Sequence, residues 1–238
     1  MKYVYGPLKS RRLGYSLGIN LVPSKVCQFD CVYCQLKRTT QKTMARRRYF
    51  DEEEILEDVR NFFRYKPQDC QVDHVTFSGS GEPTLHRSIG RLIRAVKKIT
   101  PVSVVVITNS AALVDARVRR EIAAADIIVP SLDAVTQDIF EKIDRPEKGI
   151  KISRIIRALT RLRVEFKGKI WLEVMLVRGV NDSDAYLKKI RDVVKGLSPD
   201  KIQINSPVRP PSESWVKSPT KKTLESAKKI FGVLAEVI

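Results

Sequence analysis

The stretch VTFSGSGEPTLHRSIGRLIRAVKKITPVSVVVITN, residues 75–109, contains one complete strand–helix–strand unit. Its two ends, 75–80 and 102–109, are short runs rich in apolar, β-branched residues, which is typical of strands buried on both faces of a sheet. The pattern of residues 86–99 between them is helical. This order predicts two parallel strands joined by a right-handed crossover.

The same alternation extends over most of the chain. Further strands are predicted at 16–22, 126–132, 170–177 and 201–206, and further helices at 51–65, 115–124, 150–165, 184–196 and 221–237. Six strand–helix units predict an α/β fold, either a partial (β/α)6 TIM-like barrel of parallel strands or an open doubly wound sheet. In both, the loops that follow the strands share one rim, where ligands bind.

Length and composition indicate how many domains the chain forms and in which compartment it works. A chain of 238 residues can bury a sizeable core, so we expect a single domain. It comprises an N-terminal strand with a cysteine-rich loop and a basic loop (1–50), the repeated units (51–206), and a C-terminal loop and helix (207–238). No apolar run approaches the roughly 20 residues of a membrane span, and the N-terminus lacks the apolar segment of a signal peptide. We therefore expect a cytoplasmic protein with no membrane partner.

Three of the four cysteines lie in the loop after the first strand, within VCQFDCVYCQL (26–36). Cytoplasmic thiols stay reduced, so Cys27, Cys31 and Cys34 indicate metal ligands rather than disulfides. A structural zinc site needs four ligands, and no second closely spaced pair of cysteines follows. Three thiolates on one short loop can instead hold three irons of a four-iron four-sulfur cluster and leave the fourth iron open. Zinc and free thiols remain as alternatives.

The spacing C-x3-C-x2-C, with Tyr33 directly before the last cysteine, resembles the hallmark of the radical S-adenosylmethionine superfamily. The resemblance implies a partial barrel, one [4Fe-4S] cluster on the three cysteines, and S-adenosylmethionine bound to the open iron. It also implies that an electron, from a donor such as ferredoxin or flavodoxin, leads to cleavage into methionine and a 5′-deoxyadenosyl radical that abstracts a hydrogen atom. The cofactors carry this chemistry, and the protein supplies position and electrostatics.

The loop after the second strand extends the resemblance. In the superfamily a Gly-Gly-Glu segment binds the methionine ammonium, and Ser80, Gly81 and Glu82 occupy that place here, with serine for the first glycine. Glycine lets the backbone approach a ligand, and a carboxylate accepts a charge-assisted hydrogen bond from an ammonium. By itself, a glycine-rich turn before a helix could equally indicate a phosphate loop.

Three later loops complete the S-adenosylmethionine site that the resemblance implies. Asn109 after the third strand, and Ser131 and Asp133 after the fourth, would reach the methionine carboxylate and the ribose hydroxyls. Val177 and Gly179 after the fifth strand resemble the adenine-contacting turn of the superfamily. Simpler roles stay open, because Asp133 could cap the following helix and Asn109 could satisfy a turn.

Three residues stand outside these motifs. Cys70 is alone before the second strand and is expected to be a small, partly buried side chain. Glu173 interrupts the apolar fifth strand and could face either the substrate cavity or solvent, since a buried carboxylate without a partner is costly. His86 could begin a helix and have no catalytic duty.

Charge points to a nucleic-acid substrate. Lysine and arginine number 44 against 27 acids, a formal net charge of +17. Six cations without an intervening acid lie between Leu36 and Phe50, and the loop after the sixth strand adds more. The expected RNA contacts are Arg46, Arg47, Arg48, Arg209 and Trp215. Phosphates attract the cations and an extruded base can stack on the aromatic ring, so we expect RNA, and tRNA first, although a solvated loop is the plain alternative.

A narrower resemblance agrees with RNA. The segments GPLKSRRLGYSLGINLVP (6–23) and SGSGEPTLH (78–86) resemble the branch that includes the archaeal tRNA wyosine-forming enzymes. Those enzymes use three additional cysteines for a second cluster and a lysine that engages pyruvate, whereas only Cys70 is left over here. We therefore expect no second cluster on this chain's thiols, and no residue is assigned a catalytic role. The alternatives are a radical enzyme for a small metabolite or a partner polypeptide, and a non-enzymatic metal protein.

Overall fold

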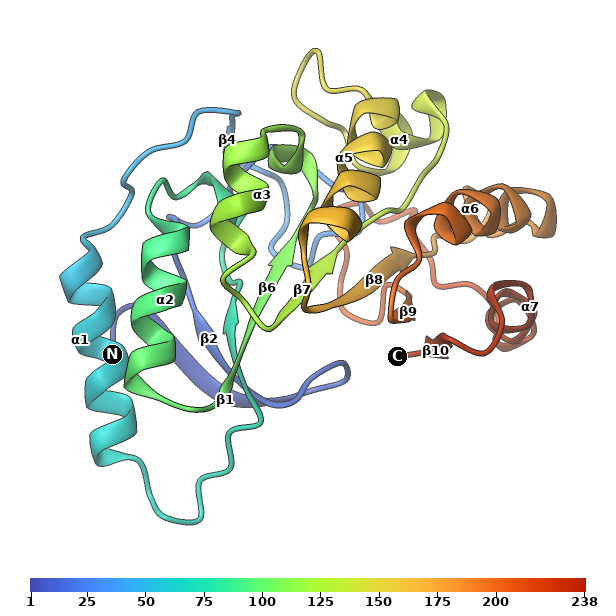
Figure 1. Ribbon diagram of the computed structural model, residues 1–238. Helices are drawn as coiled ribbons and strands as arrows, with labels where there is room; N and C mark the ends of the chain where they lie inside the picture. The colour runs from blue at the N-terminus through green and yellow to red at the C-terminus, as the bar shows by residue number, and fades with distance from the viewer.

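A computed structural model describes all residues, 1–238. Its centre is a sheet of eight strands in the order β1-β2-β5-β6-β7-β8-β9-β10, in which only the pair β1 and β2 is antiparallel. The sheet is curled into a half barrel whose outer face carries the helices (Figure 1). The predicted partial barrel is confirmed, and the open doubly wound sheet is wrong.

The six predicted strands form the centre of the sheet. They are β2 (Gly14–Ile19), β5 (His74–Phe77), β6 (Ser103–Thr108), β7 (Ile127–Pro130), β8 (Lys169–Met175) and β9 (Lys201–Asn205). The helices are α1 (Glu52–Tyr65), α2 (Ile89–Ile99), α3 (Ala116–Ile122), α4 (Gln137–Ile143), α5 (Ile152–Glu165), α6 (Asp184–Leu197) and α7 (Lys221–Phe231), with 3-10 turns η1 (Pro83–Leu85) and η2 (Ala111–Val114). A separate short ladder joins β3 (Val26–Cys27) to β4 (Gln41–Lys42). None of the helices combines the length and apolarity that crossing a bilayer requires.

Alternating side chains give the sheet two different faces. In β8, Ile170, Leu172 and Val174 belong to the main core of 51 buried residues between sheet and helices. The intervening Trp171 and Glu173 point to the opposite, inner face, because successive residues of a strand project to opposite sides. The inner face is therefore the one that can carry polar groups.

Two edge strands were not predicted. β1 (Val4–Ser10) pairs with β2, but its pairing register shifts between Tyr5 and Leu8, where Gly6 and Pro7 interrupt the strand pattern. β10 (Ala235–Val237) pairs with β9. The predicted helix at 221–237 is wrong for residues 232–237, because Gly232 takes a φ of +85° and ends α7. The residues that follow cover the free edge of β9.

Candidate functional site

The loop that carries the cysteines lies against the glycine-rich loop that follows β5. The N–H of Lys25 donates to the carbonyl of Ser80 at 2.6 Å, and the N–H of Glu82 donates to the carbonyl of Val26 at 3.0 Å. A Cβ on Gly81 would lie 2.1 Å from the carbonyl oxygen of Val26, so only glycine fits at this crossing. The structure brings the two predicted motifs together, and Gly81 is needed for that contact.

The opposite side of the cluster loop, defined as residues 27–34, is held by α4 and the segment after it. The N–H of Val32 donates to the carbonyl of Ile143 at 2.9 Å. The ring of Phe29 meets that of Phe140 edge to face, with 5.3 Å between centroids. Contacts on both sides thus fix a loop that has almost no secondary structure of its own.

Two thiols of the cluster loop receive hydrogen bonds from nitrogen donors. The Sγ of Cys27 accepts from the Nδ2 of Asn109 at 3.3 Å, and the Sγ of Cys34 accepts from the Nζ of Lys25 at 3.4 Å. Such donors stabilise a thiolate, and hydrogen bonds to sulfur tune the potential of iron–sulfur clusters. The environment of these two sulfurs therefore suits a metal ligand.

The third thiol has an acidic neighbour. The Sγ of Cys31 donates to the carboxylate of Asp144 at 3.4 Å. Burial, with Asp144 as the next cause, raises the pKa of Cys31 well above its usual value, and burial and Glu82 raise the pKa of Cys27 to about 12. The protein alone thus keeps both thiols protonated, so binding of a metal through thiolates releases protons.

The donor set fits a cubane cluster better than a single ion. No three Cys, His, Asp or Glu side chains lie close enough together to hold one metal ion, whereas each corner of a cubane is a separate iron that takes one thiolate. Next to Cys27 in the chain, the side-chain amide of Gln28 is only half satisfied. Its oxygen accepts from the Nδ2 of Asn109 at 3.1 Å, whereas its Nε2 is buried and has no partner. An unpartnered buried donor costs roughly 1–3 kcal/mol, and the protein itself supplies no acceptor for this one.

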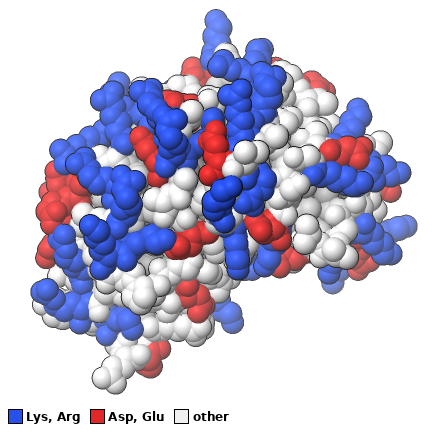
Figure 2. Space-filling model, in the orientation of Figure 1, with Lys and Arg blue, Asp and Glu red and all other residues white.

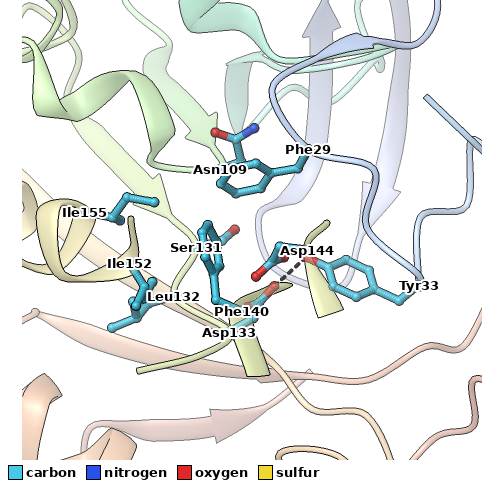
Figure 3. Close-up of a pocket in the computed structure, with 10 residues that line it drawn as sticks. All are labelled: Phe29, Tyr33, Asn109, Ser131, Leu132, Asp133, Phe140, Asp144, Ile152 and Ile155. Carbon is cyan, nitrogen blue, oxygen red and sulfur yellow. Dashed lines mark hydrogen bonds between the residues drawn. The ribbon is translucent and has the colours of Figure 1, made fainter. Parts of the chain in front are cut away.

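Four of the residues expected to bind S-adenosylmethionine line one pocket beside the cluster loop (Figure 3). Tyr33, Asn109, Ser131 and Asp133 share this pocket with apolar side chains of α4 and α5. Tyr33 enters from the cluster loop and donates its hydroxyl to the carboxylate of Asp133. The sequence therefore predicted which residues converge here, and their role as cofactor ligands stays a prediction.

Asp133 does not cap α4. Its Oδ1 accepts from the N–H of Met175 at 2.8 Å, while the Tyr186 hydroxyl accepts from the N–H of Thr136 at the start of α4. Burial raises the pKa of Asp133 to about 6. The carboxylate joins β8 to Tyr33. Asn109, by contrast, has the expected turn role, because its Oδ1 accepts from the N–H of the second residue after it. Its role as a cofactor ligand stays a prediction.

Glu82 is buried and engaged by the protein itself. Its Oε1 accepts from the N–H and hydroxyl of Thr84 and from the hydroxyl of Thr108, and its Oε2 accepts from the N–H of Asn109 at 2.8 Å. Burial raises the pKa of this carboxyl, and these hydrogen bonds oppose the rise. Glu82 thus anchors the loops after β5 and β6, a duty the sequence did not reveal. Oε2 has only one protein donor, and ammonium binding there stays a prediction.

The predicted adenine turn divides into a buried and an open part. Val177 is fully buried with Val32, Met175 and Val216, beneath the cluster loop. Gly179, with a φ of +71°, has nothing within 4 Å of the position a Cβ would take. Only the second half of the turn is therefore open to a ligand.

The predicted RNA arginines do not form one free patch. Arg46 pairs with Glu121 and donates to two backbone carbonyls, and its side chain is only 18% exposed. Arg48 pairs with Asp51 and Glu52, whereas Arg47 and Arg209 are exposed without an ion pair. Arg46 therefore stabilises the fold, which an unbroken run of cations in a sequence cannot reveal.

The loop after β9 reaches the cluster loop, as expected, where the N–H of Glu213 donates to the carbonyl of Val32 at 3.0 Å. Arg209 donates to the side-chain oxygen of Gln35, and the Nζ of Lys37 donates to the carbonyl of Pro211 at 3.1 Å. Trp215 in the same loop is 44% exposed. A cation and an open aromatic ring thus lie on a loop that contacts the segment carrying the cysteines.

Sequence reasoning missed Lys25, Gln28 and Asp144. Lys25 lies two positions before Cys27, and a lysine so near a candidate thiolate could have been singled out. Gln28 carries no signal of its own. Asp144 is 113 positions from Cys31, the residue that it contacts, and no spacing rule joins them.

Residues 21–189, more than half of the chain, match the sequence profile of the Radical SAM superfamily. The chain belongs to the radical SAM superfamily. A UPF0026 protein of Methanocaldococcus jannaschii is 34% identical over 238 residues, which cover 100% of this chain and 73% of that protein. A protein of Brachyspira hyodysenteriae named GTPase Obg is 37% identical over 230 residues, 97% of this chain but 33% of its own length. The radical SAM chain thus spans a third of that relative.

Two solved structures share the fold of this radical SAM enzyme. A radical SAM methyltransferase from Sphaerobacter thermophilus has a TM-score of 0.75 at 19% identity, covering 94% of this chain and 65% of that one. The structure of TYW1 with a lysine-pyruvate adduct bound has a TM-score of 0.67 at 18% identity, and the match covers 92% of this chain and 74% of that one. The family implies a [4Fe-4S] cluster and S-adenosylmethionine, which is cleaved by a radical mechanism, so the non-enzymatic alternative is wrong.

Proposed function

We propose that this radical SAM enzyme modifies RNA, with a nucleotide of tRNA as its substrate. The bound cluster and S-adenosylmethionine would supply a 5′-deoxyadenosyl radical that takes a hydrogen atom from the substrate. Residues 1–238 act as one domain in the cytoplasm, and the electron comes from a donor such as ferredoxin or flavodoxin. Within this proposal, Cys27, Cys31 and Cys34 hold the cluster.

The chain's own residues would position S-adenosylmethionine from four loops. Ser80, Gly81 and Glu82 bind the methionine ammonium, and Asn109, Ser131 and Asp133 bind the carboxylate and ribose. Tyr33 orients Asp133. Gly179 borders the adenine, and the buried Val177 supports the turn beneath it. The shared pocket of Tyr33, Asn109, Ser131 and Asp133 supports this assignment. The amide of Gln28 supplies an additional donor beside Cys27.

The observation that carries the RNA proposal is the basic and aromatic loop beside the cluster loop. Arg209 and Trp215 lie on the loop after β9, which contacts the residues that follow Cys34. Figure 2 shows lysine and arginine spread across one whole face, with acidic side chains in smaller groups between them. A polyanion fits such a surface. An exposed ring can also receive a base that is unstacked so that its atoms can be reached.

The motifs at 6–23 and 78–86 support a relation to the branch of tRNA wyosine-forming enzymes. The likeness to TYW1, at 18% identity, supports the fold alone. Because the chain lacks three further cysteines, we propose a different reaction on RNA from the pyruvate-condensing one.

Salt-dependent binding tests the proposal. Anaerobic full-length protein is titrated into fluorescent tRNA at several salt concentrations, with Arg47→Ala and Trp215→Ala compared against Arg154→Ala on the outer surface of α5. We expect a steep log–log slope that shrinks by about one for Arg47→Ala, and weaker binding without a changed slope for Trp215→Ala. Salt-insensitive binding, or binding no tighter than to an unrelated polyanion, would overturn the RNA proposal.

One observation favours a second candidate, a radical reaction on a small metabolite or a partner polypeptide. The pairs Arg46–Glu121 and Arg48–Glu52 use part of the basic run inside the protein. If the positive charge served only such pairs and solubility, tRNA would bind no better than other polyanions. The same titration therefore separates the two candidates.

A further inference from the structure

Glu173 is a buried acid on the inner face of the half barrel. It is 7% exposed, pairs with Arg12, and its Oε1 accepts from the side-chain amide of Asn205 on β9 at 3.2 Å. The solvent-facing alternative for Glu173 is therefore wrong. A buried carboxylate needs such partners, because desolvation of an unpaired charge is costly.

Arg12 comes from the turn of the β1–β2 hairpin, which lies across the inner face. Leu13 of the same turn is 3% exposed and packs against apolar residues of β6 and β7. In Figure 1 the turn points toward the C-terminus, and Arg11 donates to the carbonyl of Ile238 at 2.9 Å. The turn thus brings two consecutive arginines to the inner side of the sheet.

A third arginine joins them from the loop after β9. Arg209 follows Asn205, to which Arg11 donates, by four positions. After the larger effect of burial, its charge helps to lower the pKa of Arg11 and of Arg12, the latter to about 10. Arg11 donates to the side-chain oxygen of Asn205 and to the main-chain oxygen of Ile238, the last residue of the chain, and Arg209 donates to the side-chain oxygen of Gln35. Among acidic side chains, the arginine trio, Arg11, Arg12 and Arg209, therefore has one partner, Glu173, which pairs with Arg12.

The arginine trio lies next to the cysteines. Gln35, which Arg209 contacts, directly follows Cys34 in the chain. The Arg12 side chain is 26% exposed and Arg11 is exposed. Solvent and ligands can therefore reach three arginines that share one acidic side chain, beside the loop where the radical is expected to form.

We propose that the arginine trio binds a phosphate group of the substrate, close to the atom that loses hydrogen. This inference rests on the proposed function and deepens it. A guanidinium matches two oxygens of one phosphate in a bidentate contact and stays charged when partly buried. The phosphate supplies the negative charge that the trio lacks, whereas Glu173 neutralises Arg12 and repels the incoming anion. The phosphate belongs either to an RNA chain or to a free nucleotide.

Matched ligands isolate the phosphate contact. Full-length protein is titrated by calorimetry with uridine, with uridine 5′-monophosphate and with a single-stranded RNA octamer. We expect the monophosphate or the octamer, but not uridine, to bind. Arg209→Gln and Arg11→Gln break no ion pair with an acidic side chain, and each weakens that binding about tenfold, the size of one charge-assisted hydrogen bond. The control Arg154→Gln removes an exposed arginine of α5 and leaves the affinity unchanged.

Glu173→Gln gives a result of opposite sign. Removing the acid leaves the three arginines without an acidic side chain beside them, so phosphate binding tightens about threefold or more, as expected when a like charge is removed beside an anion. Thermal melting confirms that each variant is folded. If the octamer binds and the trio variants weaken that binding, the phosphate belongs to RNA. If only the monophosphate binds and the trio variants weaken that binding, the phosphate site is supported and the RNA proposal is overturned. Octamer binding unaffected by the trio variants, equal binding of uridine and its monophosphate, or no binding at all overturns the inference.

Discussion

The ammonium of Lys25 lies 3.4 Å from the sulfur of Cys34, although Lys25 itself is only 7% exposed. A cation at this distance favours the more negative, reduced state of a cluster bound through that sulfur. We therefore expect Lys25→Met to lower the reduction potential of the reconstituted cluster by about 50 mV, close to the 59 mV of a tenfold change in a one-electron couple. A redox titration followed by electron paramagnetic resonance measures it. An unchanged or higher potential would show that Lys25 does not act on the cluster.

The three-ligand arrangement predicts which cysteines hold iron. Anaerobic reconstitution should give about four irons per chain, as one cubane requires. Cys27→Ala, Cys31→Ala and Cys34→Ala should each abolish the cluster, whereas Cys70→Ala, the matched control, should retain it. Iron analysis and visible absorption report the result. Equal loss of iron in Cys70→Ala would mean that the ligand set is wrong.

Glu82 should matter for both stability and cofactor binding. Glu82→Ala removes the acceptor of four hydrogen bonds, and we expect it to lower the free energy of unfolding by about 3 kcal/mol. Urea denaturation measures this loss. Calorimetry should show S-adenosylmethionine binding weakened about ten- to a hundredfold, whereas Thr108→Val, which removes one of the donors, should keep the affinity. Equal weakening in both variants would assign the effect to loop structure rather than to the ammonium contact.

His86 should make the protein less stable in mild acid. Its Nδ1 accepts from the N–H of Ser88 at 3.2 Å and its Nε2 lies 3.1 Å from the carbonyl oxygen of Phe50, so the neutral ring fits both partners. Burial lowers the pKa of His86 below 6.5. The unfolded chain therefore binds more protons just below pH 6.5, and stability falls as the pH drops through 6.5 toward the folded pKa, by up to about 1.4 kcal/mol per pH unit.

Urea denaturation between pH 5 and 7.5 tests the His86 effect. His86→Asn should flatten the pH dependence without abolishing it, because burial lowers the pKa of His74 as well. An identical pH slope in the variant and the original protein would contradict the assignment.

The sequence predicted what repeats and what is close in the chain. Apolar runs gave the six central strands, and C-x3-C-x2-C with SGSGEP predicted two loops that the structure joins through Gly81 and Val26. The edge strand β10 was missed because the helical pattern of side chains continues past Gly232. The helix ends there through the positive φ of Gly232, which is a backbone feature that the side-chain pattern does not show.

Contacts between distant segments could not be predicted. Asp144 contacts Cys31 and Arg12 contacts Glu173, and the members of each pair are more than a hundred positions apart in the sequence. Only the curling of the sheet into a half barrel brings them together. The ion pair of Arg46 with Glu121 likewise depends on where α3 lies. A run of cations in a sequence records charge, and the fold decides which of them remain free.

Nucleosides in cellular tRNA test the central proposal most directly. The tRNA from cells with and without the gene is digested and compared by mass spectrometry, and the deletion is complemented with the original chain or with Cys34→Ala. We expect one modified nucleoside to disappear in the deletion, to return with the original chain, and to stay absent with Cys34→Ala. Identical nucleoside profiles in all four samples would contradict a role in tRNA modification.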